Sequence, residues 1–540
     1  MRSVLFAARS AVALNRLLDV LPVFAGDDRI ERLFTLMPGS DFHVEALAAV
    51  EHVGAKTLPW EHALHRPFDL VLAANPKGML GLLRGTRVLL PHGAGFSKRV
   101  PGEGSAGSGL DPANLVQDGR SVASFHALAH PSHVERLASL APEAAAHAAV
   151  IGDPTLERIL ASRALRDRYR ETLGTGARRL IVLISTWGPE SLLRRRPTLP
   201  AELAARLPHD AFQIALIVHP NARSQIGSFD LAERLAPALD AGMILPAPYE
   251  EWAAVLIASD AVITDHGSTA LYAAALDLPV IGAYDGGVEL ISGSPMEELL
   301  TRSPHLDGPG DLVAAIDGNM RGSGPLLAES VFAEQGHGLE RLRDALYSLL
   351  GLTPPPGPAT ARLLRDPSAP TRAPAAFAVR AWIDGDQVRV ERRPAHSDPP
   401  ADHLAAEYGA AGERHIQSAG LIYRRADRRS PSVYDLTWTV DAWTAHILDD
   451  HPGCRLAAVI VTPSLAVARA RGGALVSARL RACTGDGRIV RTDPSAVLSA
   501  IYAWLAAHPD LPADIACVIA DQTFQVRLSR ATAFEAARPV

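Results

Sequence analysis

The feature that most constrains the fold is an alternation of short apolar segments and helical segments over the first 350 residues. The apolar segments with the length of buried strands include 4–8, 68–74, 180–185, 212–218 and 261–264. Helical spacing follows several of them, for example over 11–20 and 270–276. Strands that alternate with helices form parallel sheets covered by helices on both faces. The sequence therefore predicts an α/β fold.

The alternation falls into two Rossmann-like halves with a cleft between them. We expect a first half at 1–150 and a second half at 151–351. Residues 352–374 hold seven prolines and predict a linker that acts as a semi-rigid tether. Residues 375–540 predict a C-terminal α+β domain of unknown role. Further expected elements are strands at 32–37, 87–90, 124–129, 243–245 and 279–283, helices at 44–53 and 249–259, hairpins around 384–385 and 484–486, and an amphipathic helix at 496–507.

Composition excludes several classes of protein. The net charge of −6 argues against a nucleic-acid binder that works through a basic surface. The three cysteines have neither disulfide nor metal-ligand spacing, and they fit a reducing compartment. The apolar stretches are too short to cross a bilayer, and the N-terminal run lacks a signal-peptide core. We therefore expect a cytoplasmic protein.

The run Asp265-His266-Gly267-Ser268-Thr269 follows a buried strand and opens a helix. Ser268 and Thr269 are residue types that cap helices, and the amides at a helix start attract anions such as phosphate. Gly267 would let the backbone approach a ligand closely. The sequence predicts phosphate binding here, and a well-capped helix without a ligand is the alternative.

Two histidines follow strands in the two halves. His92 lies in a loop with Gly93 and Lys98, where an imidazole is suited to act as general base on an acceptor hydroxyl. His219 begins a His-Pro-Asn turn in the second half and could donate a hydrogen bond to a pyrophosphate oxygen. Structural roles, capping a loop or packing beneath it, remain open for both.

Other site types lack support. His126, His130 and His133 straddle a strand end without a metal-ligand spacing, so we expect no metal site. A G-x-G-x-x-G run at 102–107 opens no helix, and no Walker A sequence or serine-nucleophile elbow occurs. Kinase, dehydrogenase and serine-hydrolase interpretations therefore lose their usual support.

Over about residues 80–290 the chain resembles the CDP-glycerol glycerophosphotransferase family, GT-B transferases that build teichoic-acid-type polyol phosphate polymers. The motifs that carry the resemblance are His92-Gly93 with Lys98, Gly152-Asp153-Pro154 with Glu157, Thr186-Trp187, His219-Pro220 and Thr264-Asp265-His266-Gly267-Ser268. Three features depart from the family pattern: Lys98 is one position late, Glu157 replaces aspartate, and His266-Gly267 replaces Tyr-Ser.

The resemblance implies transfer of a glycosyl or polyol-phosphate group from a CDP- or UDP-linked donor to a hydroxyl acceptor, polymeric or lipid-linked, without a bound cofactor. His92 and His219 are the expected catalytic residues. The expected nucleotide- or phosphate-binding residues are Gly93, Lys98, Thr186, Asp265, His266, Gly267, Ser268 and Thr269. Membrane-surface association and homo-oligomers stay open. The alternatives are a nucleotide-sugar 2-epimerase and a non-catalytic protein that binds a nucleotide or partner in a degenerate cleft.

Overall fold

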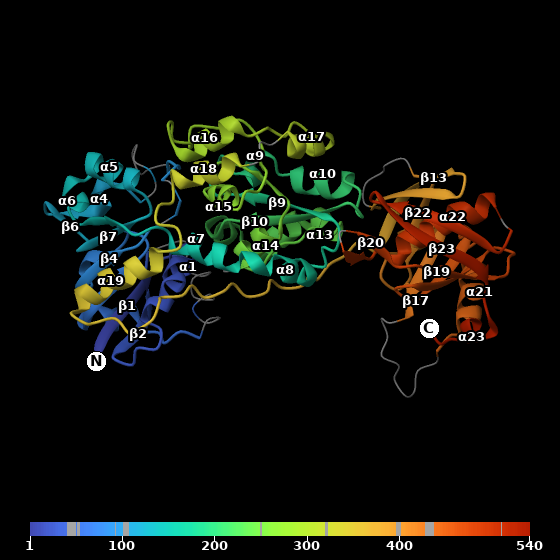
Figure 1. Cartoon of the computed structure of the whole chain (residues 1–540), viewed down its shortest axis with the longest axis horizontal. Coiled ribbons are helices and arrows are strands. Elements are labelled where there is room, and N and C mark those ends of the chain that lie inside the picture. The colour runs from blue at the N-terminus through green and yellow to red at the C-terminus, as the bar shows by residue number, and fades with distance from the viewer. Residues whose placement is uncertain are drawn as a thin grey trace.

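The structure is a computed structural model that arranges three bodies in a row (Figure 1). They are a first half with the N-terminus, a second half in the middle, and a C-terminal domain. The residues that the structure describes are 1–39, 50, 54–91, 93–94, 96–100, 107, 109–248, 251–318, 322–395, 401–426, 437–485, 487–508 and 510–540.

The first half is built on one parallel sheet of six strands, as expected for an α/β fold. Its strands in spatial order are β2 (Ile30–Leu36), β1 (Arg2–Ala8), β3 (Pro67–Ala73), β4 (Arg84–Leu89), β7 (Phe125–Leu128) and β8 (Ala148–Val150). Helix α1 (Ala11–Asp19) follows β1 directly, and α5 (Pro131–Leu140) follows β7. The helix expected at 44–53 lies outside the described residues apart from Val50.

The second half has a parallel sheet of four strands. In spatial order they are β10 (Phe212–Val218), β9 (Arg179–Ser185), β11 (Ala261–Thr264) and β12 (Val280–Gly282). The helices that matter for the site are α7 (Pro154–Ser162), α11 (Pro220–Ile226), α14 (Glu251–Ala258) and α15 (Thr269–Ala275). The strand expected at 243–245 is reduced to one bridge, between Ile244 and Ala215.

Helix α19 (Gly338–Leu350) returns the chain to the first half. Its apolar residues Leu342 and Leu346 belong to the same buried cluster as Val4 and Phe6 of β1. The stretch 151–351 is therefore shared between the two halves. None of the helices in the described part of the chain combines the length and the apolar character needed to cross a membrane.

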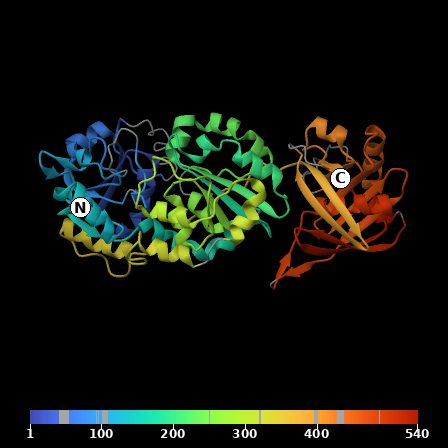
Figure 2. The same ribbon diagram turned by 90° about the horizontal axis from the view of Figure 1, so that it is seen from above.

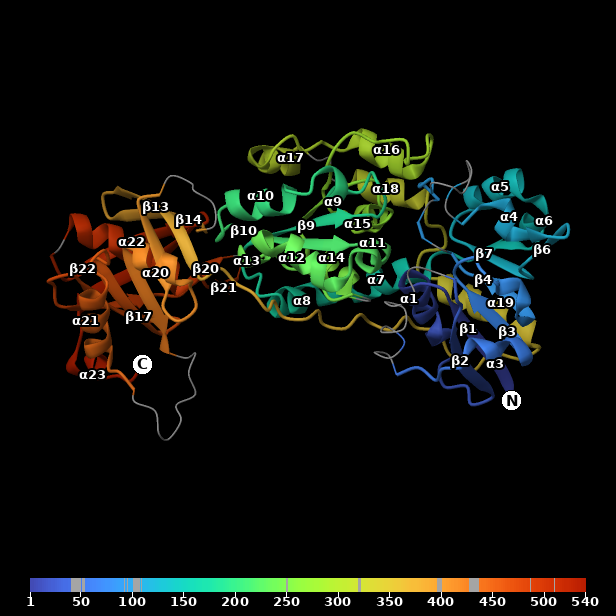
Figure 3. The same ribbon diagram turned by 180° about the vertical axis from the view of Figure 1, so that it is seen from behind.

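Residues 352–374 form a strap that runs along the second half toward the C-terminal domain (Figure 3). Leu364 is buried, and its amide donates to Ser162 Oγ over 2.9 Å while its carbonyl accepts from the Tyr169 hydroxyl over 2.9 Å. Arg158 donates to the carbonyl of Arg362 over 2.8 Å. The strap contains no helix or strand, as expected of a linker, but it is anchored along the second half and is not a free tether.

The C-terminal domain contains both helices and strands, and its sheet closes into a nine-stranded barrel. The strands in spatial order are β13 (Ala376–Asp384), β14 (Gln387–Pro394), β22 (Ala513–Ile519), β23 (Gln522–Arg530), β19 (Leu475–Leu480), β18 (Leu465–Ala470), β17 (Leu456–Thr462), β16 (Leu421–Arg425) and β15 (His403–Glu407).

One expectation for this domain was wrong, and a second was confirmed only in part. Helix α22 (Pro494–Ala507) is not amphipathic, because its first eight residues are all buried in the apolar core of the barrel. The hairpin expected around 484–486 is present between β20 (Cys483–Gly485) and β21 (Arg488–Val490), but it is short, because the preceding strand β19 pairs with β23. Figure 2 shows this hairpin projecting from the barrel. A buried helix pattern and long-range pairing are not readable from local periodicity.

Candidate functional site

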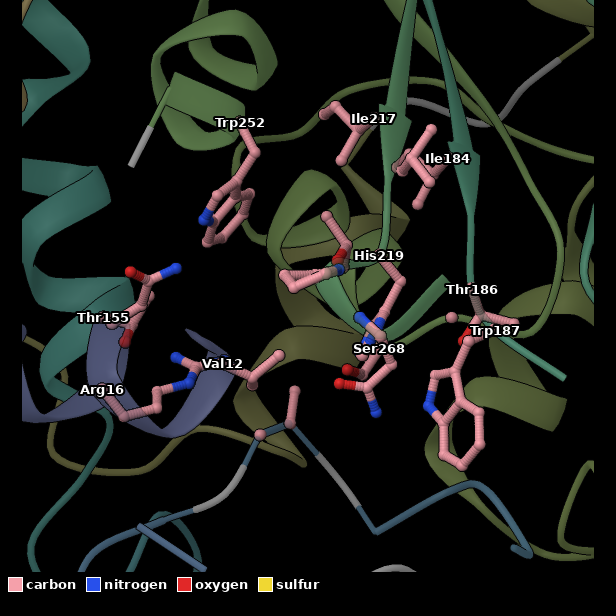
Figure 4. A pocket seen from close by; sticks show the side chains of 18 of the residues that line it. Val12, Arg16, Thr155, Ile184, Thr186, Trp187, Ile217, His219, Trp252 and Ser268 are labelled. Atoms are coloured by element: carbon pink, nitrogen blue, oxygen red, sulfur yellow. The ribbon is translucent and has the colours of Figure 1, made fainter. Parts of the chain in front are cut away.

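A cavity of about 300 Å³ lies between the two halves. It is bordered by residues that follow β1, β3 and β4 of the first sheet and β9, β10 and β11 of the second. Carboxyl ends of parallel strands are where open α/β sheets bind ligands. Figure 4 shows Arg16 and Thr155 on one side of the pocket and Trp187 on the other, with His219 between them. The expected cleft is therefore present.

Asp265 supports this pocket from behind its wall. Its buried carboxylate accepts hydrogen bonds from the amides of Thr186 and Leu192 over 2.8 Å each, and from the amide of Gly267 over 2.8 Å. Burial raises the pKa of Asp265 to about 6, against the lowering effect of these amides. The carboxylate thus joins the loops that follow β9 and β11. Asp265 itself is not among the described residues that line the pocket.

Ser268 and Thr269 line the pocket at the start of α15. Ser268 occupies the N-cap position, but its side chain makes no capping hydrogen bond, which differs from the expected cap. Gly93 of the first half comes close to this hydroxyl, because a Cβ placed on Gly93 would lie 3.7 Å from Ser268 Oγ. The predicted phosphate-binding residues Gly93, Gly267, Ser268 and Thr269 are therefore gathered at one place in the cleft.

His219 lies at the N-cap of α11 with its ring at the pocket. Its Nδ1 accepts a hydrogen bond from the amide of Asn221 over 3.1 Å. An imidazole nitrogen that accepts from an amide carries no proton, so a neutral His219 carries its proton on Nε2. The backbone therefore fixes this histidine as an Nε2–H donor. The ring centroid of Trp187 lies 6.3 Å from that of His219.

The lining of the pocket is cationic. Among the described residues that line it, the charged side chains are six cations, Arg9, Arg16, Lys77, Lys98, Arg158 and Arg223, and one carboxylate, Asp19. Asp19 is already paired with Arg158, whose Nη1 lies 2.9 Å from its Oδ1. Arg16 lies 3.7 Å from Asp153, a residue behind the pocket. This balance favours an anionic ligand. Arg16, Asp19 and Arg158 were not predicted as site residues, because no local sequence motif marks them.

Lys98 and His266 meet at Glu289, which the sequence analysis did not single out. The Lys98 ammonium lies 3.2 Å from Glu289 Oε2, donates to the Trp187 carbonyl, and lies 4.7 Å from the Trp187 ring centroid. Burial lowers the pKa of Lys98, and the Glu289 charge opposes that shift. His266 Nε2 is 3.0 Å from the same carboxylate oxygen, and burial lowers the pKa of His266 to about 4.

Glu190, His266 and Glu289 bring potential metal ligands within 4.8 Å of one another. One of the two carboxylates already has a cationic partner, because the Lys98 ammonium is in contact with Glu289. The group therefore has the composition of a metal site, but the chain itself supplies a cation there.

One end of the pocket is apolar. Ile184, Ile217 and Trp252 line it, together with Leu364 from the strap (Figure 4 labels the first three). An apolar wall opposite a cationic one suits a ligand with an aromatic or apolar part and an anionic part. Leu364 could not be assigned from the sequence, because its partner Ser162 in α7 lies 202 residues earlier in the chain.

The remaining predicted histidines have structural surroundings or lie outside the described residues. His92 lies outside the described residues, so its role stays a prediction. His130 caps α5 by accepting from the Ser132 amide, and His126 Nε2 lies 2.9 Å from Ser121 Oγ. His133 packs against Phe96, with ring centroids 5.0 Å apart.

No family model matches the sequence, and no curated protein matches it. Several solved structures are similar to this chain. The wall teichoic acid polymerase TagF shares 14% identity over 65% of this chain and 89% of that chain, with a TM-score of 0.47. MnaA of S. aureus, solved with UDP, shares 10% over 66% and 99%, with a TM-score of 0.42. A UDP-GlcNAc 2-epimerase from Methanocaldococcus jannaschii shares 12% over 64% and 100%, with a TM-score of 0.42. These similarities cover about two thirds of this chain, at identities and TM-scores that transfer no reaction to it.

Proposed function

We propose that this protein is an enzyme that moves a glycosyl or polyol-phosphate group from a nucleotide-activated donor to a hydroxyl acceptor. One observation carries the proposal. The pocket between the carboxyl ends of two parallel sheets has six cationic side chains and one carboxylate among its described lining residues, beside an apolar wall with Trp252. A nucleoside diphosphate has the matching chemistry, since it joins an aromatic base to an anionic pyrophosphate.

In this proposal each residue has a defined part. The hydroxyl of Ser268 and the backbone at Thr269 bind the donor phosphates, and Gly93 leaves room for the group that is transferred. His219 donates from Nε2 to the phosphate oxygen that gains charge as the donor bond breaks and the electron pair leaves with the nucleotide. His92 takes the proton of the attacking acceptor hydroxyl. The CDP or UDP identity of the donor and the polymeric or lipid-linked nature of the acceptor are part of the proposal.

The decisive first measurement is a thermal-shift panel with CDP, UDP, GDP and their sugar and polyol conjugates. A ligand that binds only the folded state raises the melting temperature. We expect at least one nucleotide to do so, and to lose affinity in Ser268→Leu, where the larger side chain fills the space next to Gly93. Ser330→Leu, at an exposed helix end, is the control. The proposal fails if every nucleotide leaves the melting temperature unchanged.

A nucleotide-sugar 2-epimerase would use the same anionic ligand in the same pocket. It needs only donor and water, whereas a transferase consumes donor faster when the acceptor is added. Proton NMR of the donor incubated with protein in deuterated water separates the two reactions. Incorporation of deuterium at the second carbon of the sugar would replace the transferase proposal by the epimerase.

A further inference from the structure

Two short segments join the halves beside the pocket, Ser97–Arg99 of the first half and Glu289–Ile291 of the second. The amide of Arg99 donates to the Glu289 carbonyl over 2.7 Å, and the amide of Ile291 donates to the Ser97 carbonyl over 2.9 Å. Lys98 and Leu290 face each other as the antiparallel pair between these two bonds. We call these two segments the latch.

The side chain of Lys98 continues the connection into the second half. Its ammonium lies 3.2 Å from Glu289 Oε2 and donates to the Trp187 carbonyl. It also lies 4.7 Å from the centroid of the Trp187 ring, within cation–π range. Both Lys98 and Trp187 line the pocket. The same ammonium therefore connects the latch to the wall of the candidate site.

Glu289 is held firmly in its own half. Its amide donates to Glu190 over 2.8 Å, and the amide of Val288 donates to the same carboxylate over 3.0 Å. A side chain at Gly287 would collide with this carboxylate, since a Cβ there would lie 2.2 Å from it. The loop is thus built around Glu190, which leaves Glu289 to face Lys98 and His266.

Lys98 and Glu289 depend on each other electrostatically. Glu289 is 4% exposed, and its Oε1 has no hydrogen-bond partner among the described residues. Its other neighbour, His266, has a pKa lowered to about 4 by burial and is therefore neutral near pH 7. Lys98 thus supplies the charge that compensates a buried carboxylate. Removing either member leaves the other as a buried, uncompensated charge, which is strongly unfavourable.

We infer that Glu289 is a positioning residue. It holds Lys98 across the boundary between the halves, and so keeps the latch closed and Trp187 in place at the pocket. The effect on the reaction rests on the proposed function, but the closure itself does not. With the Glu289 charge removed, the latch amides open more often, and a nucleotide in the pocket dissociates faster.

The test measures hydrogen exchange of peptides that contain the amides of Arg99 and Ile291, in the ligand-free full chain. Glu289→Gln keeps the shape and removes the charge. We expect exchange at these amides to accelerate by about tenfold or more, with exchange in the strands of both sheets unchanged. Glu297→Gln is the control, because this glutamate of helix α16 (Pro295–Arg302) follows the latch closely in the chain but accepts from the Gly293 amide in an exposed hydrogen bond. Unchanged exchange in a folded Glu289→Gln protein overturns the inference.

Variants of the lysine keep the test decisive if Glu289→Gln does not fold. Lys98→Arg retains the charge and should retain most of the protection, whereas Lys98→Met should lose it. Equal protection in both lysine variants also overturns the inference. Stopped-flow binding of CDP and UDP then asks whether Glu289→Gln raises the nucleotide dissociation rate. If no nucleotide of the thermal-shift panel binds the unmodified protein, the proposed function fails, and the exchange experiment still decides the latch.

Discussion

The guanidinium of Arg392, in strand β14 of the barrel, donates two hydrogen bonds of 2.6 and 2.8 Å to the carboxylate of Asp210 in the second half. The Arg392 side chain is fully buried, and it also contacts Ser495 Oγ over 2.6 Å and Asp493 Oδ2 over 3.2 Å. Beside it, the amide of His209 donates to the Arg392 carbonyl over 2.8 Å. The barrel is therefore attached to the second half by a buried charge network as well as by the strap.

Asp210→Ala should weaken this attachment, because it takes one carboxylate from a buried arginine. We expect a loss of about 3 kcal/mol in the free energy of unfolding and faster proteolytic cleavage within residues 352–374. The measurements are urea unfolding and limited proteolysis of the full chain. Asp240→Ala is the control, since Asp240 pairs with Arg372 where both side chains are about half exposed, and it should cost under about 1 kcal/mol. Equal effects of the two variants would show that the network does not hold the barrel.

His219→Ala should reduce turnover of the nucleotide-activated donor by about 10²–10³-fold. This is the usual loss when one hydrogen bond to an oxygen that gains charge in the transition state is removed. His130→Ala is a matched control, because His130 also caps a helix through a His-Pro pair and accepts an amide at Nδ1. Each variant should lose about 1 kcal/mol of stability from the lost cap. Release of nucleotide from the donor that shifts the melting temperature is the assay. Equal turnover in both variants would assign His219 a capping role alone.

Leu364→Ala should lower the free energy of unfolding by about 3 kcal/mol, because a buried leucine leaves a cavity when truncated. It should also weaken nucleotide binding, since Leu364 lines the pocket. The adjacent Leu363 is 49% exposed, and Leu363→Ala should change the unfolding free energy by less than about 0.5 kcal/mol. Calorimetric titration and urea unfolding of both variants test the strap as part of the site. Normal affinity in Leu364→Ala would remove the strap from it.

Stability should fall as the pH drops from about 6.5 toward 4. Burial lowers the pKa to about 4 in five histidines, His126, His133, His209, His266 and His403. Between these values and the ordinary pKa near 6.5 the unfolded chain binds protons that the folded chain does not, so each histidine contributes about 1.4 kcal/mol per pH unit to the loss. Asp265, whose pKa is raised to about 6, opposes this loss, as do Asp19 and Glu157, whose pKa values burial also raises.

Urea unfolding at several pH values between 7.5 and 5 gives the slope of stability against pH. His209→Gln should reduce that slope by about 1.4 kcal/mol per pH unit, even where it lowers stability overall. Replacement of the exposed His62 should leave the slope as it is. A slope that His209→Gln does not change would contradict the assignment of a neutral imidazole in the folded chain.

The site could be predicted only in part. Ser268, Thr269, Gly93 and His219 were found because each follows a buried strand, and parallel strands bring their carboxyl ends to one edge. The orientation of Asp265 toward three amides could not be read from the same run, since it depends on a loop 79 residues earlier. Arg16, Arg158 and Glu289 carry no local signal at all. Their significance comes from partners on other elements.

The sequence by itself determined the parallel α/β architecture of the two halves, the strand ends that carry polar loops, and the connector before a third domain, because periodicity, helix caps and proline content act over neighbouring residues. Only the tertiary structure decided which residues face one another across the boundaries. In the folded chain α19 packs against the first sheet, and Leu364 anchors the strap to the second half. Helix α22 is buried in the core of the barrel, and Lys98 contacts Glu289. These contacts join residues that are far apart in the chain, and they form because buried charges need partners and apolar faces need cover, requirements that no local pattern records.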